Sequence, residues 1–133
     1  MIYAESNTTI ISSTFTGNIA SGSRAYGGAI YAGSGNTITS STFIGNIASG
    51  ATAQGGAIWV DSSNTITNNN FSSNIANSLD GHGAAIYAYG SSNNISSNTF
   101  TANSVGGSGG AIYVYGNSNT ISRLRSYLRC PGR

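Results

Sequence analysis

Residues 13–32 read STFTGNIASGSRAYGGAIYA, and residues 41–60 read STFIGNIASGATAQGGAIWV. The second stretch repeats the first 28 positions later, and this period runs along most of the chain. One apolar position of the repeat is occupied by Ile2, Ile30, Ile58, Ile86 and Ile112. A repeat of about 20–50 residues is typical of solenoids, propellers and arrays. We therefore expect a stack of similar coils rather than an ordinary globular core.

One repeat, taken as residues 27–54, has the pattern of a single coil. Its apolar, β-branched and aromatic residues are bounded by Gly, Ser and Asn, and no stretch keeps a helical spacing. We expect short strands at 27–32, 36–39 and 42–47, turns at 33–35 and 40–41, and a small-residue loop at 48–54. Stacking predicts an all-β parallel solenoid of about 4–5 coils, with ~28 residues and three short strands in each coil.

The alternation of side chains along each strand predicts which residues fill the core. In the type unit the inward residues are expected to be Ile30, Ala32, Ile38, Phe43, Gly45 and Ile47. A second isoleucine ladder is expected from Ile10, Ile38, Ile66, Ile95 and Ile121. A phenylalanine ladder is expected from Phe15, Phe43, Phe71 and Phe100. Identical neighbours in successive coils would then stack without gaps.

Two sets of asparagines also recur at the coil spacing. The first set follows each ladder phenylalanine by three positions and comprises Asn18, Asn46, Asn74 and Asn103. The second set precedes each second-strand isoleucine by two positions and comprises Asn36, Asn64, Asn93 and Asn119. Asparagine tolerates left-handed turns, bonds to the backbone, and can form amide ladders along a stack. We expect both sets to be structural ladders at the corners of the coil.

Composition and charge argue against several classes of protein. Residues 1–122 carry one arginine and three acids, so no basic face follows a phosphate backbone and we expect no nucleic-acid binding. The single cysteine, Cys130, supports neither a disulfide framework nor a metal cluster, and we expect no cofactor. No apolar run is long enough to cross a bilayer.

Both ends of the chain depart from complete repeats. The first residues align with the middle of a repeat, and the repeat text is lost after Ser122. We expect residues 1–122 to be the repeat array of a fragment, and residues 123–133 to be a disordered or artefactual basic tail. Coils without caps expose strand edges, so self-association through the open ends is also expected.

Two tetrapeptides connect the repeat to a known family. GGAI occurs at 27–30, 55–58 and 109–112, with the variant GAAI at 83–86. FxxN occurs at 15–18, 43–46, 71–74 and 100–103. The array resembles the polymorphic outer membrane protein repeat of surface autotransporters. The resemblance implies a right-handed parallel β-helix, displayed as an adhesin-like passenger that is secreted or held at the cell surface or outer membrane.

Outward aromatic residues give the best candidate for a binding site. The position after the first-strand isoleucine holds Tyr3, Tyr31, Trp59, Tyr87 and Tyr113. Tyr89 and Tyr115 extend the set two residues further along the strand. An exposed aromatic stripe is suited to sugar rings or to a partner protein. The alternative is that the rings stack on one another and only stabilise the sheet.

Evidence for catalysis is sparser. Glu5 and Asp61 share one row two coils apart, roughly 10 Å by strand spacing, which is near the separation of an inverting glycosidase pair. Residues 81–83 read GHG, a motif similar to one in polygalacturonases, but the paired aspartates and basic clamp of those enzymes are missing. We expect solvated acids and a coincidental motif, and no catalytic residue.

The function expected from the sequence is non-catalytic adhesion or surface display by part of a larger β-helix protein. The partners would be glycans or surface proteins of a host or neighbouring cell. A second hypothesis is a carbohydrate-binding or polysaccharide-processing enzyme whose active site lies outside these residues. A third is a structural spacer.

Overall fold

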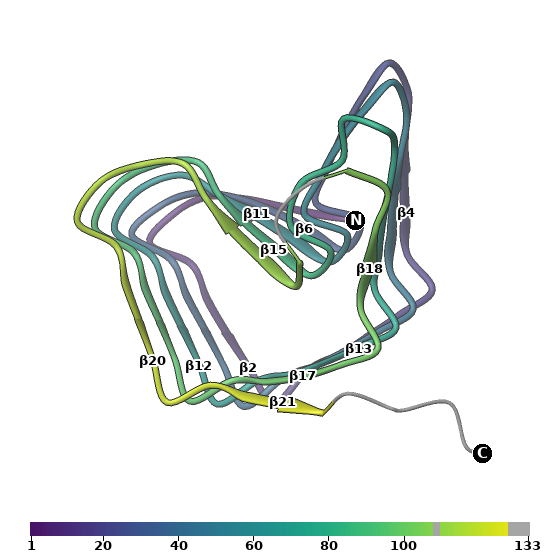
Figure 1. The fold of residues 1–133 in the computed structure, drawn as a ribbon. Coiled ribbons are helices and arrows are strands. Elements are labelled where there is room, and N and C mark those ends of the chain that lie inside the picture. Colours follow the sequence, from purple (N-terminus) through teal and green to yellow (C-terminus); the bar gives the residue numbers. More distant parts are fainter. Residues whose placement is uncertain (108–109, 128–133) are drawn as a thin grey trace.

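The computed structural model describes residues 1–107 and 110–127. They wind as a parallel β-solenoid in which each strand pairs with its counterpart in the next coil, so that the coils nearly superimpose along the axis (Figure 1). The described residues contain no helix. The predicted all-β parallel β-helix, with coils of about 28 residues, is confirmed.

Three five-stranded sheets line the main core, as the three predicted strands of each coil require. Sheet A contains β1 (Ile2–Ser6), β6 (Ile30–Ser34), β11 (Ile58–Val60), β15 (Ile86–Ala88) and β19 (Ile112–Val114). Sheet B contains β2 (Thr9–Ile11), β7 (Thr37–Thr39), β12 (Thr65–Thr67), β16 (Asn94–Ser96) and β20 (Thr120–Ser122). Sheet C contains β3 (Thr14–Thr16), β8 (Thr42–Ile44), β13 (Asn70–Ser72), β17 (Thr99–Thr101) and β21 (Arg125–Tyr127).

Two shorter sheets occupy the segment where a loop was expected, so that prediction is wrong at 48–54. Sheet D contains β4 (Ile19–Ser21), β9 (Ile47–Ser49), β14 (Ile75–Asn77) and β18 (Ser104–Val105). Sheet E contains β5 (Arg24–Tyr26) and β10 (Thr52–Gln54), and a single bridge from Gln54 to His82 extends it. Sheets D and E with their connecting turns form the side lobe, which rises beside sheet A in Figure 1.

The side lobe has its own core of small side chains. Ala20, Ala48 and Ala76 from sheet D meet Ala25 and Ala53 from sheet E, and all five are buried. Alanines on both surfaces let sheets D and E approach closely. The low hydrophobicity of this segment gave no sign of such packing in the sequence. The sequence-based expectation that Ile47 points into the core is therefore wrong: Ala48 takes the inward position and Ile47 is half-buried.

The main core follows the predicted ladders. Ile30, Ile38 and Phe43 are fully buried, and the phenyl rings of successive coils stack with centroids 4.8–5.1 Å apart. Gly45, however, does not face inward, because its positive φ of 60° places it in the turn after sheet C. The turn predicted at 33–35 is also shorter, since β6 continues to Ser34 and Gly35 alone turns the chain with a φ of 75°.

Each corner of the main core pairs a left-handed residue with a buried polar residue that follows it. Ser73, with a φ of 54°, precedes Asn74, whose Oδ1 accepts hydrogen bonds from Asn46 N and Asn46 Nδ2, both at 3.0 Å. The asparagine itself is not the left-handed residue, so its tolerance of left-handed turns is not the reason for its presence. A third ladder, not predicted, contains Ser13, Ser41, Asn69 and Asn98 between sheets B and C.

The pairing continues past the point where the repeat text ends. Residues 125–127, assigned from the sequence to the basic tail, form β21 and align with Thr99–Thr101. The loss of recognisable repeat residues after Ser122 therefore does not end the strand pairing. Residues 128–133, with Cys130 among them, lie outside the described residues.

Candidate functional site

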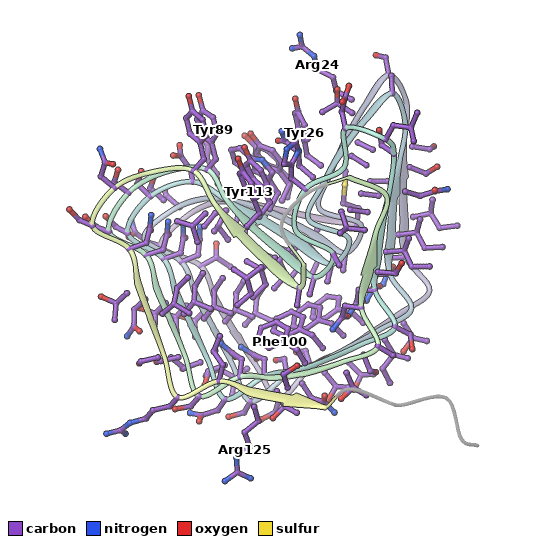
Figure 2. The ribbon with its side chains drawn as sticks, in the orientation of Figure 1. Arg24, Tyr26, Tyr89, Phe100, Tyr113 and Arg125 are labelled. Carbon is purple, nitrogen blue, oxygen red and sulfur yellow. The ribbon has the colours of Figure 1, made fainter. Side chains whose placement is uncertain are left out.

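The outer face of sheet A meets the side lobe along two rows of mostly aromatic side chains (Figure 2). We call these two rows the aromatic seam. Sheet A contributes Tyr3, Tyr31, Trp59, Tyr87 and Tyr113. The side lobe contributes Tyr26, Gln54 and His82, which occupy equivalent positions in successive coils.

The sheet A row forms a continuous column of stacked rings because the strands pair in register. Ring centroids are 5.3 Å apart for Tyr3 and Tyr31, and 4.4 Å apart for Tyr31 and Trp59, with an interplanar angle of 3° in the second pair. The column continues from Trp59 to Tyr87 at 6.5 Å and from Tyr87 to Tyr113 at 5.3 Å. Within the column, ring faces are therefore directed at the rings of the neighbouring coils.

The side lobe covers the middle of this column. Tyr26 stacks on Trp59 with centroids 5.9 Å apart, and the indole Nε1 of Trp59 donates a hydrogen bond to Gln54 Oε1 at 3.2 Å. His82 packs edge-on against Tyr113 at 4.6 Å. The seam is thus a second packing interface rather than a stripe open to solvent along its length.

Exposure differs sharply between the centre and the ends of the predicted stripe. Trp59 is 7% exposed and Tyr87 4%, whereas Tyr3 is 67% exposed. The expectation of an exposed stripe is wrong for Trp59 and Tyr87: they lie on the outer face of sheet A, but the side lobe shields them from solvent. At these two positions the alternative interpretation, in which rings stack to stabilise the sheet, describes the contacts.

A second, exposed column branches from Trp59. The ring of Tyr89 lies 5.5 Å from that of Trp59, and Tyr115 stacks on Tyr89 at 5.5 Å with an interplanar angle of 3°. Tyr89 is 48% exposed and Tyr115 65%. Tyr89 points away from the solenoid (Figure 2). These two phenols form the rim of the seam and are its most accessible part apart from Tyr3.

The seam is a weakly polar environment that disfavours charge. Burial, followed by the neighbouring phenols, raises the pKa of Tyr87 to about 12. Burial also raises the pKa of Tyr31, with smaller contributions from Tyr3 and Asp61. Both hydroxyls therefore keep their protons to a higher pH than an ordinary tyrosine does.

The residues considered for catalysis do not converge. Glu5 of β1 and Asp61, the residue directly after β11, follow the register of sheet A with Gly33 between them, and Asp61 Oδ1 accepts a hydrogen bond from Ser62 Oγ at 3.1 Å. His82 belongs to the seam, where its Nδ1 is buried without a hydrogen-bond partner among the described residues. No group of three or more His, Cys, Asp or Glu side chains suited to a metal gathers in the part of the chain that is described.

The structure also explains why the two tetrapeptides have their composition. In GGAI the first glycine has a positive φ, 60° at Gly27 and 70° at Gly55. A side chain at the second glycine, Gly28 or Gly56, would collide with the backbone of sheet D in the same coil. In FxxN the phenylalanine fills the core, and the asparagine Nδ2 donates a hydrogen bond to the phenylalanine carbonyl of the preceding coil.

The row of the seam that the side lobe contributes was not predicted from the sequence, because its members differ chemically. Tyr26, Gln54 and His82 occupy the position before the first glycine of each tetrapeptide, which from the sequence has the character of a variable loop position. Their regular 28-residue spacing was the available signal. It indicates a strand facing sheet A once the segment before the glycines is recognised as extended.

Comparison with known proteins agrees with the geometry. No curated protein and no solved structure gives a significant match to the chain. In the described part of the chain, no helix has the length and apolar character needed to cross a membrane. Residues 1–125 match the family model described as a right handed beta helix region, and the chain therefore belongs to the right-handed β-helix family.

Proposed function

We propose that this chain is a non-catalytic binding region of a secreted or surface-displayed β-helix protein. Its partners are glycans or surface proteins of a host or neighbouring cell. The observation that carries the proposal is the exposed rim of the aromatic seam, where Tyr89 and Tyr115 stand side by side at 48% and 65% exposure. Tyrosines that keep one end apolar and one end wet are enriched at recognition surfaces.

The rim binds through ring edges and hydroxyl groups rather than through ring faces. The face of Tyr89 that points along the column is already stacked on Tyr115, and its other neighbour is Trp59. A sugar ring or peptide would therefore accept and donate hydrogen bonds at the two phenols and lie across the ring edges. This arrangement favours a shallow contact, of the kind that suits adhesion by many weak sites.

A relation to the polymorphic outer membrane protein repeats supports the surface-display half of the proposal. Both tetrapeptides of that repeat have a physical role in this chain. The glycines of GGAI form a turn and allow a close approach of backbone, and the asparagine of FxxN belongs to a corner ladder. We propose that the chain uses the same repeat for the same purpose, a rigid scaffold that presents side chains outside the cell.

The test is binding of intact cells and a glycan panel by the full chain and by Tyr89→Ser/Tyr115→Ser. Leu79→Ser is the matched control, because Leu79 is an exposed apolar residue in the turn of the side lobe, away from the rim. We expect the unmodified chain to bind, the affinity of the double variant to be lower by about tenfold or more, and the affinity of the control to change little. Equal binding by all three chains, or none across cells and glycans, contradicts it and favours a structural spacer.

A further inference from the structure

A polar trough of about 510 Å³ runs along the corner between sheets B and C. One wall is the row of left-handed turn residues Ser40, Asn68, Ser97 and Arg123. These residues have φ values of 51–57°, which hold successive side chains at the rung spacing of roughly 4.8 Å. The trough therefore presents regularly spaced hydroxyl and amide groups and ends at a guanidinium.

The other wall comes from the first residue of each sheet C strand. Thr42, Asn70, Thr99 and Arg125 are in register there, so a second arginine stands beside the end of the trough. Arg125 projects away from the solenoid in Figure 2. Both arginines are exposed, and the nearest positions of the preceding coil are the small residues Ser97 and Thr99.

The floor of the trough is rigid. Asn69 Oδ1 accepts a hydrogen bond from Ser41 N at 2.9 Å, and Asn69 Nδ2 donates to the carbonyl of Ile38 at 2.9 Å. Ser41 and Asn69 are both buried. A ligand lying on this floor meets groups that need no reordering, which lowers the entropic cost of binding.

The charged side chains that line the trough are all positive. None of its lining residues is acidic, and the three acids of the chain lie elsewhere: Glu5 in β1, Asp61 directly after β11, and Asp80 in the side lobe. Guanidinium groups bind carboxylate and sulfate oxygens through charge-assisted, often paired, hydrogen bonds. The neutral part of the trough offers the hydroxyl and amide groups that pair with sugar hydroxyls.

We propose that this trough binds an anionic glycan chain, with a sulfate or carboxylate at Arg123 and Arg125 and the neutral sugars along the turn row. A nucleic acid fits less well, because duplex DNA carries about one charge per 1.7 Å and the trough offers two cations at one end only. Among the residues that the structure describes, no aromatic ring on which a base could stack lines the trough. The site lies on a different face from the aromatic seam and is independent of the function proposed above.

The experiment measures binding of a sulfated oligosaccharide and of a uronic acid oligosaccharide by calorimetry, against neutral oligosaccharides of equal length. The main variant is Arg123→Ser/Arg125→Thr, which restores the residue types that occupy these rows one coil earlier. Arg24→Ser, at the exposed end of the side lobe, removes a charge without touching the trough. Circular dichroism of each variant checks that the strands are retained.

The unmodified chain is expected to bind at least one anionic oligosaccharide about tenfold more tightly than its neutral counterpart. Affinity is expected to fall about tenfold in the double variant and less than about twofold in Arg24→Ser. Asn70→Asp, which places a carboxylate in the trough at an exposed position, is expected to weaken binding as strongly as the double variant. The proposal would be overturned if the chain bound neutral and anionic oligosaccharides with equal affinity, or if Arg24→Ser lost as much affinity as the double variant. It would also be overturned if a single-stranded oligonucleotide bound more tightly than the oligosaccharides and the same double variant abolished that binding.

Discussion

Trp59 Nε1 donates a hydrogen bond to Gln54 Oε1 across 3.2 Å, and this contact joins sheet A to the side lobe. The two residues are only five positions apart, but the chain turns back between them at Gly55. The bond satisfies a largely buried indole donor and fixes the position of β10 over the aromatic column. The side lobe is therefore held against sheet A by a specific polar contact as well as by ring packing.

Replacing Gln54 by Ala is expected to destabilise the protein by about 1–3 kcal/mol, because the indole N–H of Trp59 loses its partner while shielded from water. Urea unfolding monitored by circular dichroism measures this change. Acrylamide quenching of Trp59 should also increase as the side lobe loosens. Thr52→Ala on the same strand is the control, and equal effects of the two substitutions would contradict a special role for the hydrogen bond.

The phenylalanine ladder is expected to be most sensitive in its middle. Phe43 is fully buried between two stacked rings, whereas Phe15 is half-buried and has a stacked partner on one side only. Phe43→Ala should cost about 3–5 kcal/mol, and Phe15→Ala should cost less. Chemical denaturation of both variants tests the order, and the reverse order would show that the ladder does not carry the stability of the main core.

Asn74 is expected to matter through hydrogen bonds between coils. Its Oδ1 accepts from Asn46 N, and its Nδ2 donates to the carbonyl of Phe43, both at 3.0 Å. Asn74→Ala leaves both backbone groups without partners in a buried corner, at a cost of about 2–5 kcal/mol. Asn77→Ala, at an exposed position of the same coil, should change stability by less than about 0.5 kcal/mol, and a similar change at both sites would refute the ladder explanation.

Much of the fold could be predicted from the sequence because one period determines the register. Ile30, Ile38 and Phe43 lie at fixed places in every coil, so their burial follows from alternation within strands and stacking between coils. Ile47 was placed wrongly because the turn at Gly45 resets the alternation, and residues 48–54 were expected to be a loop because alanine is a weak strand signal.

The burial of residues in the candidate site was harder to predict, because it depends on the side lobe. Alternation places Trp59 and Tyr87 on the outer face of sheet A, and that is where they lie. Their burial depends on a neighbouring element, the side lobe, whose strands carry no strong apolar pattern of their own. Only the tertiary arrangement separates the buried rings from the exposed rim at Tyr89 and Tyr115.

The second glycine of GGAI is expected to be less replaceable than Gly45, the glycine at the corner after sheet C. A Cβ at Gly56 would overlap the backbone of Ile75 and the carbonyl oxygen of Ala84, so Gly56→Ala should cost about 1–3 kcal/mol or more. Gly45 also has a positive φ, but no atom lies within 4 Å of the position that a Cβ would take there, and Ala102 occupies the same corner two coils later. Gly45→Ala should therefore cost about 1–2 kcal/mol or less. Thermal unfolding of the two variants gives the comparison, and equal losses would mean that the close approach of backbone to Gly56 is not the reason for the motif.

Stability is expected to fall in strongly alkaline solution because of Tyr87. Burial raises its folded-state pKa to about 12 from the ordinary value of 10.0. Between these two values the unfolded chain has lost the phenolic proton while the folded chain keeps it, so raising the pH favours unfolding. The contribution is fully present below pH 10 and is lost as the pH approaches 12. Urea unfolding across this range should show the decline, and Tyr87→Phe should make it shallower because the phenol is removed with little change in packing. An unchanged slope in Tyr87→Phe would show that the hydroxyl of Tyr87 is not shielded within the seam.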